Sequence, residues 1–185
     1  MKIFTLFILL LSSLFLHANN VNINKIDTIN QYVSKIKNKN YELKTRLIAD
    51  VNVFADLNNK EGTYSYEGEK IYRLEIVNLE KSYTQDEQLI KIKVPLIGDR
   101  EDLISHYYYQ KNNLVFVRKQ YTSFDMPKWH EKHDKRKNTF IETKFYFEND
   151  KLLLVESTKK KILNLSKQDI KELLSDSQLY FNYKH

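Results

Sequence analysis

Segment 125–137 gathers more side chains capable of chemistry than any other stretch of the chain, because it holds the sole tryptophan, two histidines and five basic residues. His130 and His133 are three residues apart, a spacing that can place two imidazoles on one face of a helix, and the carboxylate of Asp134 would complete a zinc ligand set. The order His-Glu-Lys-His is one residue shorter than the H-E-x-x-H string of zinc peptidases, so that mechanism is not inherited. A zinc site at these three residues therefore stays open beside the alternative of a solvated charged loop.

The same segment is also a candidate for anion recognition. Its basic side chains would face phosphates or an acidic glycan, and its indole would stack on a sugar ring. The alternative is an ordinary wet surface, since acidic residues are interspersed with the basic ones. The residues concerned are Lys128, Trp129, Lys132, Lys135, Arg136 and Lys137.

Thirteen tyrosines offer a second kind of contact surface. Tyrosine supplies rigid amphipathic contact area at protein-binding surfaces, but such rings also fill cores with their hydroxyls reaching water at the rim. Tyr108 and Tyr146 fall on the strand face opposite the strongest core candidates, and His106 lies beside Tyr108. If that face is open, we expect these two rings to form a binding surface.

Composition excludes several classes of site. Without cysteine the chain has no disulfide, no thiol nucleophile and no cysteine-ligated metal, and its three glycines cannot supply a dinucleotide fingerprint or a P-loop. No nucleophile elbow or paired carboxylate string is present either. We therefore expect a non-catalytic protein without a cofactor, zinc being the one exception considered. The alternative is a hydrolase or metal-dependent enzyme with a site near His106 or near His130 and His133.

Residues 1–18 have the three parts of a secretory signal: a positive charge at Lys2, an apolar stretch, and a small residue, Ala18, at the cut. The apolar stretch is about 14 residues, whereas a membrane span needs roughly 20, so cleavage is favoured over anchoring. We expect residues 19–185 to form a single domain without a transmembrane span. The expected location is the periplasm, otherwise the extracellular space, and no nucleic-acid partner is expected.

An internal repeat predicts the fold. Three segments share an aromatic–any–aromatic triplet, four turn-like residues and an aliphatic residue, at positions 64–71, 107–114 and 145–152. Each is typical of a β-hairpin, with its two-residue turn at 68–69, 111–112 or 149–150. These turns place Tyr66 opposite Ile71, Tyr109 opposite Leu114, Phe147 opposite Leu152, Tyr107 opposite Phe116 and Phe145 opposite Leu154.

Both faces of these hairpins carry apolar residues, which indicates that something covers part of the second face. In the second hairpin Phe116 is expected beside Tyr107 on one face, and Val117 beside Tyr108 on the other. Helices are predicted at 24–37 and from Ser166 onward, while residues 179–183 are predicted as a closing strand or a docked tail.

The remaining strands are weaker, and one at 89–94 is expected to stop at Pro95. The predicted fold class is α+β: an antiparallel β-meander of about seven or eight strands built from three similar hairpins, packed by an N-terminal and a C-terminal helix.

The segment 107–117 carries a resemblance to uncharacterised exported bacterial proteins in which a YYY-type strand, a short polar turn and an L-x-F-V strand recur. The resemblance spans at most residues 64–155 and implies no known activity or catalytic residues. The expected function is therefore binding of a protein partner or of an anionic glycan or lipid of the cell envelope.

Overall fold

The structure, a computed structural model, describes residues 23–37, 44–47, 65–66, 69–70, 75–76, 79–159 and 165–183. Two compact units are distinguished, Met1–Tyr41 and Glu42–His185. In the first unit residues 23–37 form the predicted helix, with Ile29, Val33 and Ile36 as its buried stripe. The predicted signal segment lies outside the described residues, and among the residues that are described no helix is long and apolar enough to cross a membrane.

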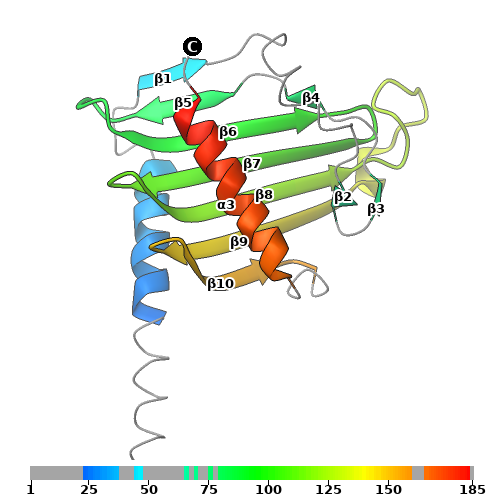
Figure 1. The fold of residues 1–185 in the computed structure, drawn as a ribbon. Helices are drawn as coiled ribbons and strands as arrows, with labels where there is room; N and C mark the ends of the chain where they lie inside the picture. Colours follow the sequence, from blue (N-terminus) through cyan, green and yellow to red (C-terminus); the bar gives the residue numbers. More distant parts are fainter. Residues whose placement is uncertain are drawn as a thin grey trace, which may run out of the picture. The chain divides into compact units, whose positions relative to one another are not determined.

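The second unit contains an antiparallel sheet whose centre is a meander of six consecutive strands (Figure 1). In the described part of the chain, two short strands extend this sheet, β1 (Lys44–Leu47) beside β5 and β4 (Glu75–Ile76) beside β6. The α+β class with an antiparallel meander is confirmed, but the meander has six strands where seven or eight were predicted. Its strands are β5 (Glu80–Tyr83), β6 (Leu89–Ile97), β7 (Glu101–Gln110), β8 (Asn113–Ser123), β9 (Thr139–Glu148) and β10 (Lys151–Ser157).

The first of the three predicted hairpins is not part of the meander. Its strands β2 (Ser65–Tyr66) and β3 (Glu69–Lys70) form a separate two-stranded sheet. Tyr66 pairs with Glu69, so the predicted pairing of Tyr66 with Ile71 and the predicted turn at 68–69 are both wrong. A single glycine suits either central position of several turn types, which is why Gly68 did not fix the register.

The second and third hairpins turn where the sequence predicts. Tyr109 pairs with Leu114, and Phe147 pairs with Leu152. Left-handed backbone at both central positions, with φ between 49° and 66°, makes these type I′ turns, whose twist matches that of the flanking strands. The turn residues are Lys111, Asn112, Asn149 and Asp150.

A β-bulge follows each of these turns. Tyr109 pairs with Leu114 but Tyr108 pairs with Phe116, so Val115 is the extra residue of β8, and Leu153 is the extra residue of β10. Because a bulge moves every later residue by one position, the predicted pairs of Tyr107 with Phe116 and of Phe145 with Leu154 are wrong. Val117 and Val155 take those positions instead.

The bulge also corrects the assignment of side chains to faces. Val117 joins the main hydrophobic core. The ring of Phe116 packs instead against Tyr108, with centroids 5.5 Å apart, and against Tyr146, at 5.0 Å. Phe116 therefore lies on the face that was predicted to hold Val117.

The repeated hairpin does occur three times in the meander, but the first copy is β5–β6. Tyr83 pairs with Leu89, and Ile90 is the bulged residue that follows. Its turn spans residues 84–88 and is closed by a hydrogen bond from the Thr84 N–H to the Gln88 carbonyl, at 2.9 Å. The sequence template required an aromatic residue where Lys81 stands and a two-residue turn, so it missed this hairpin, which shares only the aromatic–leucine pair and the bulge.

The strand β6 continues through Pro95, where the sequence predicts its end. Pro95 pairs with Ile104 of β7 on one side. On the other side, β5 pairs up to Lys93 and β4 pairs from Leu96, so Pro95 falls between two partners. A residue without an N–H donor is least costly at such a gap in the ladder.

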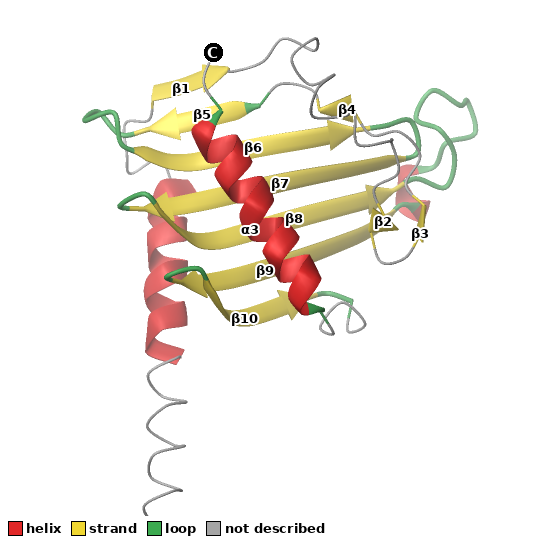
Figure 2. Ribbon diagram, viewed as in Figure 1, coloured by secondary structure: helices red, strands yellow, loops and turns green. Residues whose placement is uncertain are grey.

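The helix α3 (Lys167–Asn182) crosses one face of the meander diagonally (Figures 1 and 2). It begins at the predicted capping box, in which the Asp169 N–H donates to the Ser166 hydroxyl and the Ser166 N–H donates to the Asp169 carboxylate. The prediction of a strand or tail at 179–183 is wrong, because residues up to 182 continue the helix. The rings of Tyr180 and Phe181 lie 5.6 and 5.1 Å from those of Tyr107 and Tyr109.

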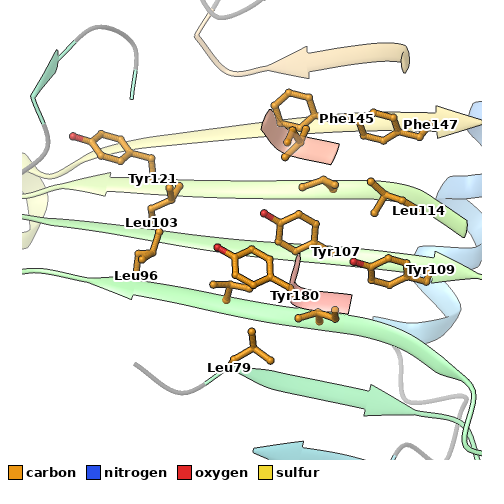
Figure 3. Close-up of a cluster of buried hydrophobic side chains, with 14 of the residues drawn as sticks. Leu79, Leu96, Leu103, Tyr107, Tyr109, Leu114, Tyr121, Phe145, Phe147 and Tyr180 are labelled. Atoms are coloured by element: carbon orange, nitrogen blue, oxygen red, sulfur yellow. The ribbon is translucent and has the colours of Figure 1, made fainter. Parts of the chain in front are cut away.

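The main core lies between α3 and the meander (Figure 3). Tyr109 is buried and its hydroxyl contacts both the carbonyl and the hydroxyl oxygen of Ser177, at 3.1 and 2.9 Å. At the end of the helix, the buried ammonium of Lys81 donates to the carbonyls of Phe181 and Tyr183, at 2.9 and 2.7 Å. These bonds satisfy carbonyl groups that a helix end leaves without partners, and they tie α3 to the first strand of the meander.

Candidate functional site

The candidate site is the connection between β8 and β9, residues 124–138, which we call the 124–138 loop (Figure 2). The other connections within the meander are a few residues long. Connections this long in a compact domain usually serve binding or catalysis. The sequence singled out the same segment.

The base of the 124–138 loop is fixed to the turn between β6 and β7. The Phe124 N–H donates to the Arg100 carbonyl at 2.7 Å, and the Lys128 N–H donates to the Asp99 carbonyl at 2.9 Å. The Lys128 ammonium also lies 2.6 Å from the Asp102 carboxylate and 4.8 Å from the Phe124 ring centroid. Lys128, predicted to face an anionic ligand, is therefore held mainly by an acidic side chain of β7.

A second set of contacts holds the loop from inside. The Nδ1 atom of His133 lies 3.1 Å from the Asp125 carboxylate, and the imidazole packs edge-on against Phe124. Between these anchors the backbone makes successive turns, in which the N–H groups of His130 and His133 donate to the carbonyls three residues earlier. The loop is therefore built from defined turns on a fixed base.

The three predicted zinc ligands have different partners. Asp134 caps the short 3₁₀ helix η2 (Lys135–Lys137) and binds the Arg136 guanidinium at 3.0 and 2.9 Å, and these hydrogen bonds hold the pKa of Asp134 below its usual range. His133 contacts Asp125, and the Nδ1 atom of His130 accepts from the Lys132 N–H. Within the described ranges, no three His, Asp or Glu side chains come together as a metal site would require. The zinc hypothesis gains no geometric support from these contacts.

Trp129 projects from this anchored base with 72% of its surface exposed. The side chains of Lys132, Lys135 and Lys137 are exposed on the same loop, and among the described residues none of them makes an ion pair. Arg136 is exposed too but is bound to Asp134. Of the predicted anion-binding residues, the structure thus leaves one aromatic ring and three cations available to a ligand.

The two tyrosines predicted as a binding surface are buried. Tyr108 and Tyr146 have 0% and 1% of their surface exposed, so they offer no open contact area. Phe116 packs between them. His106 is buried as well and lies in the middle of β7, where its Cα partners are Lys93 and Arg118.

Two residues with a part in these sites were missed by the sequence reasoning. Asp102, the counter-ion of Lys128, lies 26 residues earlier in the chain, and no local pattern connects the two. Arg118 is the Cα partner of His106, and the face that it occupies depends on the bulge at Val115, which no local pattern marks.

Comparisons with protein-family models, curated proteins and solved structures found no match to this chain. The resemblance to exported bacterial proteins with tyrosine-rich hairpins stays a prediction. The function proposed below therefore rests on the geometry of the chain itself.

Proposed function

We propose that this protein is an exported, periplasmic binding protein without catalytic activity, which recognises an anionic glycan of the cell envelope through the 124–138 loop. The observation that carries the proposal is the exposed indole of Trp129 on a loop with three exposed cations, Lys132, Lys135 and Lys137, that make no ion pair with any other described residue. The alternative of a hydrolase or metal-dependent enzyme at His106 or at His130 and His133 stays a prediction that these contacts do not test.

An exposed indole is a costly surface feature, since aromatic rings of this size are normally buried or used for contact. Stacking on the apolar face of a sugar ring would remove this surface from water. The ammonium groups on the same loop would then meet carboxylate or phosphate substituents of neighbouring sugars. This pairing of one flat apolar surface with separate cations favours an acidic glycan over a protein partner, which would call for a broader apolar patch.

The anchored base of the loop supports binding for a second reason. Lys128 is fixed to Asp102, and His133 lies against Asp125, so the chain on both sides of Trp129 is ordered before a ligand arrives. Association then costs less conformational entropy than it would for a free loop.

The experiment uses the sole tryptophan of the chain as its own reporter. Purified protein is titrated with an oligouronide, and with a neutral glucan as the control ligand, while tryptophan emission is recorded. We expect a saturable shift with the oligouronide alone, and a midpoint that weakens steeply with added salt because exposed charges are screened.

A matched set of variants assigns the binding. Replacing Lys132, Lys135 and Lys137 by glutamine should weaken binding at least tenfold, whereas replacing the exposed Lys111, Lys151 and Lys171, all outside the loop, should change it less than twofold. Equal losses of affinity in the two sets of variants would mean that binding depends on net charge alone, and would contradict the proposal. Saturable emission changes with an acidic peptide but not with the oligouronide would identify a protein partner instead.

Export is tested separately from binding. Fractionation of the native host should recover the protein in the periplasm, and mass spectrometry of the intact protein should show the loss of residues 1–18. A full-length chain in the cytoplasm would contradict this part of the proposal.

A further inference from the structure

The face of the meander opposite α3 is turned away from the viewer in Figure 1. The strand pairing places a row of charged residues on this face. Residues that are direct cross-strand partners share one face of a sheet. The neighbours Tyr107 and Val117 belong to the core on the α3 side, so alternation places the row on the opposite side. Its members, one from each of the strands β5 to β10, are Glu80, Lys93, His106, Arg118, Lys144 and Glu156.

A buried aromatic row lies beside the charged row, on its side toward the two-residue turns. Tyr108, Phe116 and Tyr146 are Cα partners on β7, β8 and β9, and their exposed fractions are 0%, 2% and 1%. Such a wall of rings excludes water from the polar atoms next to it. Hydrogen-bonding groups at the boundary of the two rows therefore depend on partners other than bulk water.

The outer members of the charged row have carboxylates close by. Lys93 lies 2.7 Å from Glu80, and Lys144 lies 3.7 Å from Glu156. Arg118 at the centre has a contact about as long as those of Lys144, with its Nη1 atom 3.9 Å from Glu142. This contact does not involve the Nε atom of Arg118.

Two buried donors at this centre lack an acceptor. In the part of the chain that the structure describes, neither the Nε atom of Arg118 nor the hydroxyl of Tyr108 has a hydrogen-bond partner, and both atoms are inaccessible to solvent. Their residues are diagonal neighbours, since Arg118 pairs with His106 and Tyr108 is two positions further along β7. Burial raises the pKa of Tyr108 and the charge of Arg118 lowers it, which places the guanidinium within electrostatic reach of the ring.

We propose that the carboxylate of a small organic acid binds between the Nε–H of Arg118 and the hydroxyl of Tyr108. The guanidinium Nε–H can only donate and the phenol hydroxyl can donate as well as accept, so a carboxylate, which supplies two acceptor oxygens, can take one hydrogen bond from each. Arg118 turns Nη1 toward Glu142, which leaves the Nε edge of the guanidinium for side-on contact with a planar carboxylate. This site is independent of the 124–138 loop and shares none of its residues.

The test follows the Arg118 Nε–H resonance by NMR during titration of the purified protein with formate, and then with acetate and benzoate. We expect a saturable shift in the millimolar range for formate, and the size at which binding stops measures the room available to the ligand. Tyr108→Phe removes one donor and should weaken binding about 2–10-fold, the usual worth of one hydrogen bond. The control Lys93→Gln removes a cation of the same row that has its own carboxylate, and should change affinity less than twofold.

Three outcomes would overturn the proposal. A resonance that formate does not move means that water satisfies both donors. A shift that grows linearly without saturation means non-specific screening. Unchanged affinity in Tyr108→Phe removes the tyrosine from the site, and because this variant differs by one hydroxyl, its folding is checked from the same spectra.

Discussion

The two ends of the meander differ in what their side chains do. At the turn end, which we define by the turns at 84–88, 111–112 and 149–150, aromatic rings face leucines and are buried, as for Tyr109 at 2% and Phe147 at 1%. At the loop end, defined by residues 98–100 and 124–138, Trp129 and Phe140 are 72% and 54% exposed. The buried core extends to the loop end as well, through Leu103, Tyr121 and Ile141, but among the described strands the exposed aromatic side chain lies at the loop end alone.

The largest expected effect compares two phenylalanines of β9. Phe147→Ala at the turn end should lower the free energy of unfolding by about 3–5 kcal/mol, because it empties a fully buried site. Phe140→Ala at the loop end should change it by no more than about 0.5 kcal/mol. Urea unfolding of both variants measures the difference, and equal losses would abolish the distinction between the two ends.

Alkaline pH should weaken the turn end. Burial raises the pKa of Tyr107, Tyr108 and Tyr109, so these phenols stay protonated in the folded chain at a pH where the unfolded chain, near pKa 10, releases its protons. The folded state then holds more protons, so between about pH 10 and its own folded-state pKa each such tyrosine lowers the free energy of unfolding by about 1.4 kcal/mol per pH unit. Below that pH their contribution is fully present.

The comparison with Tyr109→Phe isolates this effect. Burial under α3 lowers the pKa of Lys119, which acts in the opposite direction because the unfolded chain then holds more protons in the alkaline range. Urea unfolding at a series of pH values should therefore show a shallower alkaline loss in Tyr109→Phe than in the unchanged protein. If the free energy of unfolding fell equally steeply with pH in both proteins, Tyr109 would ionise alike in the folded and unfolded states, which would contradict the prediction.

The smallest expected effect concerns two adjacent asparagines. Asn112 has a φ of 66°, and alanine in this left-handed region costs about 1 kcal/mol. Asn113→Ala, at the first and exposed residue of β8, should cost no more than about 0.5 kcal/mol. Thermal unfolding of the two alanine variants measures whether the left-handed turn conformation contributes to stability. A larger loss in Asn113→Ala than in Asn112→Ala would contradict the prediction.

The sequence predicted the turn end better than the loop end for a physical reason. Turn chemistry and the first pair beside it are local, so Asn149-Asp150 and the pair of Phe147 with Leu152 could be read from adjacent residues. The bulges could not, because nothing in the residue types of Val115 or Leu153 distinguishes an extra residue from a paired one. Because Val115 is an extra residue that the sequence did not reveal, Phe116 and Arg118 lie on the opposite face of the sheet from the one that simple alternation predicts.

The candidate sites were predictable in proportion to how local they are. The 124–138 loop stood out by composition, and the structure places Trp129 on it with 72% of its surface exposed. The contact of Lys128 with Asp102 depends on how the loop returns to β7, and the pairing of Arg118 with His106 depends on the register of two strands. Both are properties of the folded chain that residue spacing does not encode.

The anchoring of α3 by Lys81 has a consequence for the order in which the chain can acquire its structure. The Lys81 ammonium donates to carbonyls that lie 100 and 102 residues later in the chain. The core between α3 and the meander therefore cannot close until residues 181–183 have been synthesised. A ribosome-bound chain would remain open along its apolar strands for most of translation. Under the export proposed above, such late closure would keep the chain translocation-competent until its last turn of helix emerges.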